Sequence, residues 1–439
     1  MAGLRRELAD PLARNGYALI ANSGATGVLG VAYWLLVARL YPAAEVGRAT
    51  AAYAAMNLLA GITALNFNGA LNRFIPKAGR WTGTLIARSY LVSAAASVVL
   101  AILFLLTIGW WGPSYSDLSG PLVGLAFVVC VVAWAIFTLQ DSVLVGLRGA
   151  FWVFAENSLF GVVKIVVLVL LAWALRGPGG IYASWMLPAI VAVPLVNMLI
   201  FGNLVPRHVA ASDVASPPHW REIGRFLAGD YSGALCLLVT LSLVPVVVAA
   251  RTNAAANAYF YMAWLIAAIV DMIGLSMGMS LTVEGAFDVA SLAANCRKAL
   301  RRMASMLIPC AVLLAVLAPW WLRLFGTAYA AHSARALELL AVATLPRAVT
   351  EVYLGALRAQ NRTSLVAVIQ AARAVVMLGL VVILAGTNGT VGAAAGVLAT
   401  QTVVAMSISV GLWRVLTGDR QTARRATAER RAPGEVRAQ

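Results

Sequence analysis

Apolar segments long enough to cross a lipid bilayer recur along the whole chain. A hydrocarbon core of ~30 Å requires about 20 consecutive, mostly apolar residues in helical form. The sequence of 439 residues is 62% hydrophobic and 11% charged, whereas about 25% of the residues of a soluble domain are charged. The runs are too long, and alternate too little, for a membrane β-barrel. We therefore predict an all-α polytopic membrane protein with twelve spanning helices, at 16–38, 47–72, 84–111, 120–147, 151–175, 179–203, 223–250, 254–285, 299–322, 336–357, 363–385 and 390–414.

The sequence also contains an internal repeat. The segment from Gln140 to Gly149 returns as Thr350 to Ala359 (350 − 140 = 210), with acid matching acid and arginine matching arginine. At the same offset, the tryptophan pair at 110–111 returns at 320–321. Because each half holds an even number of helices, both halves begin on the same side of the membrane. We predict two parallel six-helix repeats around a central cavity, which is a layout typical of transporters.

The longest connection predicted inside the bundle is rich in proline and histidine, at 206–208 and 216–219. The segment after it begins the second set of six helices, and the end of the chain consists mainly of Arg, Ala, Thr and Glu without an apolar face. Such a composition favours disorder. The predicted parts are an N-terminal lobe at 1–203, a cytoplasmic linker at 204–222, a C-terminal lobe at 223–415 and a basic disordered cytoplasmic tail at 416–439.

The basic residues are distributed unevenly between the two sides of the predicted bundle. Of the 33 Lys and Arg residues, most fall on the loops and termini of one side, as the positive-inside rule predicts for the cytoplasm. Both termini are therefore expected in the cytoplasm, and the protein in the cytoplasmic membrane. The net charge of +16 then reflects membrane topology, and no nucleic-acid partner is predicted.

Two parts of the first third resemble a known family. The segment from Arg39 to Gly47 and the end of the second predicted helix, from Phe67 to Ile75, are similar to bacterial oligosaccharide-lipid flippases of the multidrug/oligosaccharidyl-lipid/polysaccharide exporter superfamily. The resemblance extends to about residue 415. It implies two six-helix lobes around a V-shaped cavity and the outward movement of polyprenyl-diphosphate-linked sugars by alternating access.

The chain departs from this pattern in two ways. Asn22 and Ser23 stand where the resemblance implies an Arg-Asp pair in flippases of peptidoglycan precursors, which argues against lipid II as the substrate. The extra helix pair that holds a lipid groove in some members is absent from the twelve predicted spans.

A lipid-linked sugar diphosphate is anionic, and cationic side chains inside helices are the natural groups to bind it. Lys164, Arg347 and Arg373 lie within predicted helices, and Arg73 matches an arginine implied by the resemblance. Snorkelling of Lys164, pairing of Arg347 with Glu351 at i+4, and helix packing by the asparagines are the structural alternatives. The predicted cavity residues are Arg347, Arg373, Lys164, Asn22, Asn57, Asn68, Arg73 and Arg251.

A second set of charged residues is predicted to couple an ion or to form a gate. Asp271 is the acid closest to the middle of a helix, and the repeat-related Asp141 and Glu351 could lock an inner gate against Arg148 or Arg358. For these two arginines, anchoring the topology is the alternative. The predicted coupling or gating residues are Asp271, Glu351, Asp141, Asp230, Glu284, Arg148 and Arg358.

Four function classes compete. The favoured one is a flippase for a lipid-linked oligosaccharide or polysaccharide precursor, and the alternative is a cation-coupled multidrug antiporter of the same fold. A major facilitator is disfavoured because 67–83 lacks the glycine- and arginine-rich loop of that class. A membrane enzyme is disfavoured because no loop is long or acidic enough. The expected partners are a polyprenyl-diphosphate-linked sugar, membrane lipid and, for coupled transport, a proton or sodium ion; no cofactor and no metal are predicted.

Overall fold

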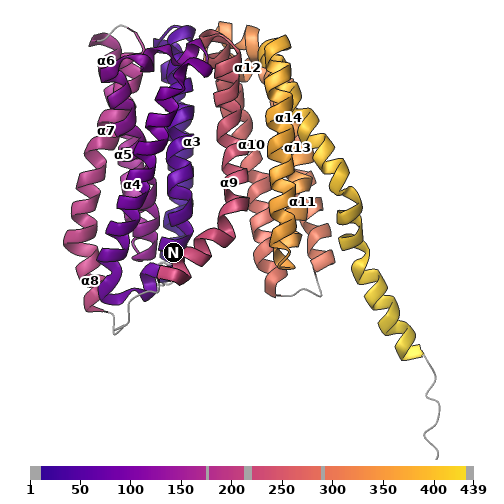
Figure 1. Ribbon diagram of the computed structural model, residues 1–439. Coiled ribbons are helices and arrows are strands. Elements are labelled where there is room, and N and C mark those ends of the chain that lie inside the picture. Colours follow the sequence, from indigo (N-terminus) through magenta and orange to yellow (C-terminus); the bar gives the residue numbers. More distant parts are fainter. Residues whose placement is uncertain (1–10, 175–176, 212–219, 288–291, 432–439) are drawn as a thin grey trace, which may run out of the picture. The chain divides into compact units, whose positions relative to one another are not determined.

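The computed structural model describes residues 11–174, 177–211, 220–287 and 292–431 (Figure 1). Every regular element within these residues is a helix. The predicted all-α fold is therefore confirmed.

The helices of the first part follow the predicted spans closely. Four short helical turns connect them: η1 (Ile75–Lys77), η2 (Gly79–Trp81), η3 (Ile108–Trp110) and η4 (Pro113–Ser119). The long helices are α2 (Pro11–Leu40), α3 (Ala43–Phe74), α4 (Thr82–Leu106), α5 (Pro121–Gly146), α6 (Ala150–Ala174), α7 (Gly179–Leu199), which continues through η5 (Ile200–Leu204) into α8 (Val205–Ala210), and α9 (Trp220–Arg251).

The remaining helices are α10 (Ala254–Phe287), α11 (Leu292–Val316), α12 (Ala318–Arg323), α13 (Thr327–Ala359) and α14 (Thr363–Arg431). α14 contains two of the predicted spans, separated by non-helical backbone at Asn388 and Gly389. It then continues to Arg431, into the segment predicted to be disordered. Ala, Arg and Glu are strong helix formers, so local propensity favours this extension even without an apolar face.

Nine stretches of the described residues are long and apolar enough to cross a membrane. The difference from twelve has three sources. α3 is not among the nine, α9 contributes the shorter apolar stretch Leu238–Arg251 within its described residues, and the two spans of α14 count as one stretch. Each of the twelve predicted spans nevertheless coincides with a helix or with half of α14, and the chain is a multi-pass membrane protein.

The chain divides into two compact units. Unit 1 comprises Met1–Met262 and Arg323–Tyr329, and unit 2 comprises Ala263–Leu322 and Ala330–Gln439. The break inside α10 differs from the lobe boundary predicted at 204–222, because α9 packs against α3 of unit 1. The functional division into lobes remains a prediction.

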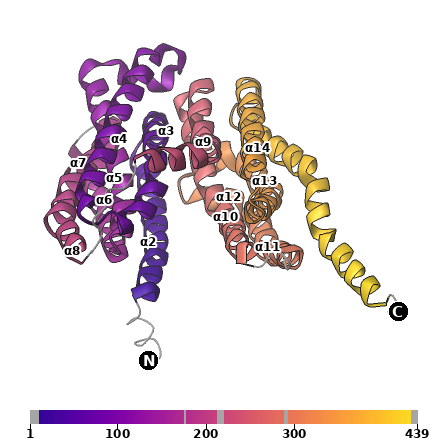
Figure 2. The ribbon, with the colours of Figure 1, turned by 60° about the horizontal axis from the view of Figure 1, so that its bottom comes forward.

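Unit 1 is built on α3 and α5, which pack against each other, with α2 lying on α6 and α4 on α5 (Figures 1 and 2). Its core contains Leu71, Ile86 and Leu139 from α3, α4 and α5. Small and polar residues bring helices together where lipid gives no hydrophobic driving force. For example, the Thr63 and Ser97 hydroxyls hydrogen-bond at 2.8 Å between α3 and α4.

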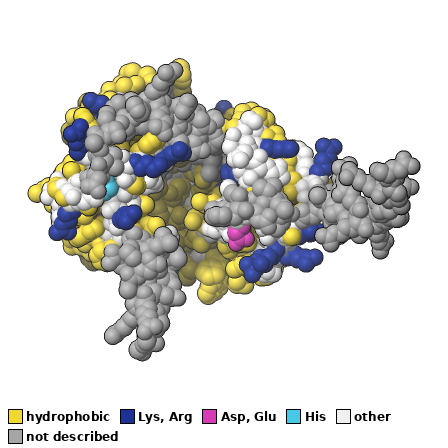
Figure 3. All heavy atoms as spheres, turned by 90° about the horizontal axis from the view of Figure 1, so that it is seen from below, with side chains coloured by type: hydrophobic (Ala, Val, Ile, Leu, Met, Phe, Trp, Pro, Cys, Tyr) yellow, Lys and Arg dark blue, Asp and Glu magenta, His cyan; other side chains and the backbone are white. Residues whose placement is uncertain are grey.

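One end of unit 1 carries the basic loops. Exposed basic side chains surround the end of the unit where α8 lies (Figure 3), and the ring nitrogen Nε2 of His208 lies 3.2 Å from the Ile75 carbonyl at the end of α3. The exposed basic residues of this end are Arg73, Lys77, Arg80, Arg88, Arg148 and Arg207.

Unit 2 has α13 as its most buried helix. In the most apolar stretch of α13, 72% of the residues are buried, against 44% or less in the corresponding stretches of the other candidate spans. α10 crosses it at small residues, since a Cβ added at Gly355 would meet the carbonyl oxygen of Gly278 at 2.6 Å. The close approach lets charged side chains of α10 and α13 meet inside the unit.

Candidate functional site

Two buried ion pairs lie in unit 2. Arg347 of α13 donates from Nη1 to Oδ2 of Asp271 on α10. Arg373 of α14 donates from Nη1 to Oε1 of Glu351 on α13, at 2.9 Å, and its side chain is 0% exposed. The structure therefore brings together four of the predicted residues, but in a pairing different from the i+4 contact between Arg347 and Glu351.

In each pair the two charges neutralise each other, but the arginine does not use all of its hydrogen-bond donors. The Nε and Nη2 atoms of both Arg347 and Arg373 are buried without a partner among the described residues. Unpartnered buried donors are destabilising unless water or a ligand satisfies them. Arg347 and Arg373 thus keep donors for a guest, but no uncompensated positive charge.

Lys164 of unit 1 has a different environment. Its ammonium on α6 lies 4.4 Å from the ring centre of Tyr33, 5.5 Å from that of Phe160 and 4.2 Å from that of Trp185. The three rings come from α2, α6 and α7, and we call these four residues the lysine cage. The Lys164 side chain is 5% exposed, and it makes no ion pair or hydrogen bond with the described residues. A cation surrounded by aromatic faces is stabilised by their quadrupoles.

The lysine cage is continuous with further aromatic residues. Trp34 and Tyr53 contact its rings edge-on or tilted, with centroids 5.2 Å apart for Trp34 and Tyr33 and 4.3 Å apart for Tyr53 and Trp185. The Tyr33 and Ser184 hydroxyls hydrogen-bond at 2.8 Å. Rings held in this way stay in place around the ammonium.

Two carboxylates of unit 1, of the buried Glu156 and the half-buried Asp141, have no cationic partner within the described part of the chain. Asp141 on α5 accepts a hydrogen bond of 3.0 Å from the Asn157 amide. Both carboxylate oxygens of Glu156 on α6 are buried without a partner, and the two acids are near enough to interact electrostatically. The sequence analysis did not single out Glu156, although an acid inside an apolar helix is the signal that could have identified it.

The repeat-related positions have thus diverged. Glu351 meets an arginine of the next helix, whereas its counterpart Asp141 meets an asparagine. The repeat places Lys164 within one residue of the position equivalent to Arg373. Lys164 contacts aromatic rings instead of a carboxylate. Buried charges form ion pairs within unit 2 but not within the described part of unit 1.

Two of the predicted asparagines hold helices together. Asn57 accepts a 2.9 Å hydrogen bond from the Trp134 indole, and Asn68 accepts one of 2.9 Å from Ser142. Asn22 differs, since its Oδ1 is buried without a partner among the described residues. These contacts support helix packing for Asn57 and Asn68.

The other predicted residues lie away from these clusters. Arg73, Arg148, Arg251 and Glu284 are exposed, Arg358 is half-buried, and the side chain of Asp230 lies outside the described residues. Arg148 adopts a left-handed backbone (φ 60°) after α5, whereas the corresponding turn after α13 comes at Asn361 (φ 59°). Arg148 and Arg358 therefore match in sequence but not in local structure. Among the described residues, no group of three or more His, Cys, Asp or Glu side chains could hold a metal ion.

Comparison with known proteins identifies the fold. The structure resembles the inward-facing conformation of a multidrug resistance MATE family transporter of the MOP superfamily, with a TM-score of 0.71, 16% identity, and coverage of 92% of this chain and 99% of that chain. It also resembles the lipid II flippase MurJ in an inward closed conformation (TM-score 0.69, 12% identity, 92% and 90% coverage). A third similar structure is a mutant of the Vibrio cholerae MATE transporter VcmN (TM-score 0.61, 13% identity, 94% and 97% coverage).

The chain shares the fold of these three structures. No protein-family model and no curated protein matches the sequence. The fold agrees with the superfamily that the sequence resembled. Because the similar structures include both a multidrug transporter and a lipid flippase, the fold alone assigns no function to this chain.

Proposed function

We propose that this protein transports a lipid-linked oligosaccharide or polysaccharide precursor across the bacterial cytoplasmic membrane by alternating access, with both termini in the cytoplasm. The observation that carries the proposal is Lys164, a buried ammonium with aromatic neighbours and no carboxylate partner in the described part of the chain. An uncompensated cation inside a membrane protein is typically functional and favours an anionic guest.

The chemistry of the lysine cage suits a sugar diphosphate. The ammonium can donate to phosphate oxygens, and aromatic rings such as Trp185 and Tyr33 offer apolar faces beside it. The substrate would thus meet its strongest positive charge in unit 1.

Transport by the purified protein tests the proposal. Proteoliposomes containing the full chain and a polyprenyl-diphosphate-linked oligosaccharide would be assayed for movement of the sugar from one leaflet to the other, using enzymatic accessibility. We expect Lys164→Met to lower the rate by about tenfold or more, the loss of one charge-assisted hydrogen bond. The matched control is Lys77→Met, at an exposed position of η1.

Unchanged transport by Lys164→Met would contradict the proposal. Equal transport by wild type and Lys164→Met, with Lys164→Met still folded, would show that the ammonium is structural. In cells, depletion of the protein should cause the lipid-linked sugar to accumulate in the inner leaflet. No accumulation would contradict the substrate class.

A specific observation favours the second candidate, a cation-coupled multidrug antiporter. The buried Glu156 interacts electrostatically with the half-buried Asp141 and has no cation beside it in the described residues, and two such acids could take up a proton or a sodium ion. Under this hypothesis Glu156→Gln abolishes proton-driven uptake of a cationic drug by vesicles, whereas Glu45→Gln, in the first turn of α3, does not. Uptake unchanged by Glu156→Gln would exclude a coupling role for this carboxylate.

A further inference from the structure

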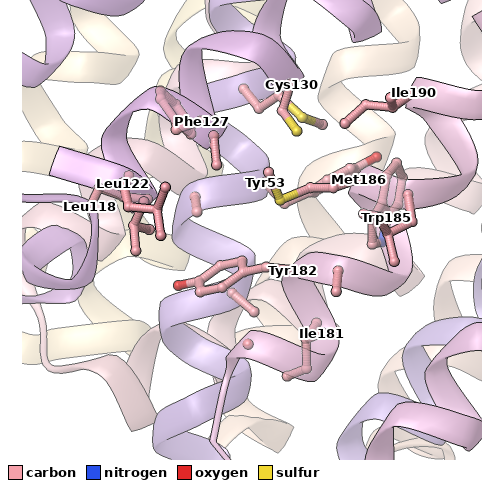
Figure 4. Close-up of a pocket in the computed structure, with 18 of the residues that line it drawn as sticks. Tyr53, Leu118, Leu122, Phe127, Cys130, Ile181, Tyr182, Trp185, Met186 and Ile190 are labelled. Atoms are coloured by element: carbon pink, nitrogen blue, oxygen red, sulfur yellow. The ribbon is translucent and has the colours of Figure 1, made fainter. Parts of the chain in front are cut away.

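Unit 1 contains an apolar pocket that neither proposed function uses. It lies between α3, α5 and α7 and has a volume of about 470 Å³, within the ~300–1,000 Å³ typical of ligand pockets. Figure 4 shows Leu118, Leu122 and Phe127 on one side of it and Ile181, Trp185 and Ile190 on the other, and the Tyr53 ring lies against that of Trp185. Its lining is almost entirely carbon.

The pocket lies beside exposed apolar side chains. Leu122 of α5 and Leu187 of α7, both in its lining, are 79% and 51% exposed. Both helices belong to stretches long and apolar enough to cross a membrane, and in a bilayer such side chains would meet hydrocarbon. Water is a poor occupant because it needs two or more polar partners, and an alkyl chain fits the lining better.

One end of the pocket carries a pair of opposite charges. Arg48 and Asp117 form an ion pair of 3.0 Å and are 29% and 33% exposed. Their sequence neighbours Ala49 and Leu118 line the pocket. Tyr182, also in the lining, interacts electrostatically with both charges. The apolar pocket thus has a rim with one cation and one anion.

We propose that this pocket binds one acyl chain of a zwitterionic bilayer phospholipid such as phosphatidylethanolamine. The phosphate would lie against Arg48 and the ammonium against Asp117, because opposite charges on the two partners are complementary. A polyprenyl diphosphate carries only negative charge and lacks a group for Asp117. The proposal does not depend on the transported substrate.

The site also touches the lysine cage. Trp185 lines the pocket and lies 4.2 Å from the Lys164 ammonium. A bound acyl chain would therefore pack against the same indole that contacts the buried charge.

Photolabelling tests the site. The full chain would be reconstituted with phosphatidylethanolamine that carries a diazirine on one acyl chain, irradiated, and digested for mass spectrometry. We expect adducts concentrated in 118–130 and 181–190. Ala126→Phe and Ala183→Phe, which fill the lining with a ring, should lower that labelling by about tenfold, as expected when a binding site is blocked. Ala96→Phe is the matched control, since Ala96 is half-buried on α4 and does not line the pocket.

Arg48→Gln keeps the proposal testable if the phenylalanine variants fail to fold. It should lower labelling by diazirine-phosphatidylethanolamine by up to about fivefold, the range of a partly exposed ion pair, and leave labelling by a diazirine alkane unchanged. Adducts spread evenly over all exposed apolar helices would overturn the site. Displacement of the label by equimolar polyprenyl phosphate, but not by added phosphatidylethanolamine, would overturn the phospholipid as its occupant.

Discussion

At the scale of single residues, the buried cations among the described residues are stabilised in two ways. In unit 2 the guanidinium groups of Arg347 and Arg373 each meet a carboxylate. In unit 1 Lys164 meets three rings. An ion pair fixes two helices together and cancels its own charge, whereas a cation held by aromatic rings remains positive towards any further partner.

The pair of Arg373 and Glu351 should be important for stability. Arg373→Met would leave the 2%-exposed Glu351 without its partner, and we expect a loss of about 3 kcal/mol or more in the free energy of unfolding. Equilibrium unfolding in detergent, followed by tryptophan fluorescence, would measure it. Arg362→Met, at an exposed position, is the control and should change stability little.

The double variant Arg373→Met, Glu351→Gln distinguishes a lost charge partner from a lost side chain. Because it removes both charges, it should recover a substantial part of the stability lost in Arg373→Met. If the double variant is as unstable as Arg373→Met, packing rather than charge explains the effect.

Sequence reasoning found Lys164, Arg347 and Arg373 because a charged residue inside an apolar run can be recognised from the sequence alone. It named Asp271 and Glu351 but did not predict which arginine each would meet, and it did not find the rings around Lys164. Asp271 lies 76 positions from Arg347, and the Tyr33 ring belongs to a helix distant in sequence from Lys164. Such contacts depend on how the helices pack, which apolar periodicity alone does not determine.

At the scale of elements, α14 contains two predicted spans, which a single break in the helix separates. Asn388 and Gly389 leave helical geometry, Gly389 with φ 57°, and the helix resumes at once. Just beyond, a Cβ at Gly392 would collide with the carbonyl oxygen of Leu384. Glycine at this position lets the backbone after the break pack against the helix before it.

Gly392→Ala should therefore destabilise the protein, by about 1–3 kcal/mol for an overpacked contact. Gly386→Ala is the matched control in the same helix, because a Cβ there meets nothing within 4 Å. Since alanine is the better helix former, Gly386→Ala should stabilise by about 0.5–1 kcal/mol. Thermal unfolding of both variants in detergent measures the difference, and equal midpoints would show that the chain at Gly392 can relax.

The positions of the helices were largely predictable, since each of the twelve apolar runs coincides with a helix or half of one. The sequence did not predict the compact units, which divide inside α10. α9 packs against α3, and the predicted division into two six-helix lobes stays a prediction. A repeat in sequence specifies similar elements, and contacts between neighbouring helices decide which of them pack together.

At the scale of the whole molecule, the number of spans decides on which side each terminus lies. An even number of spans, such as the twelve predicted, places the two termini on the same side. The proposed topology also places η4 outside the cell and α8 in the cytoplasm, consistent with the exposed basic residues around α8.

Reporter fusions test this topology. Alkaline phosphatase, active only outside the cytoplasm, should be active when fused after Ser119 and inactive after Ala210. A fluorescent protein that folds only in the cytoplasm should be bright when fused after Ala210 or Gln439. An inactive phosphatase after Ser119 would mean that α3, the most polar of the first helices, does not cross the membrane.

The shared position of Trp185 has a thermodynamic consequence. One face of this indole lines the apolar pocket, and the ring contacts the ammonium of Lys164. If a ligand on one side changes the affinity on the other, linkage requires the reverse effect to be equally large. An anion that binds at Lys164 and shifts the indole would then change the affinity for the lipid, and the acyl composition of the membrane would in turn become an allosteric effector of the protein.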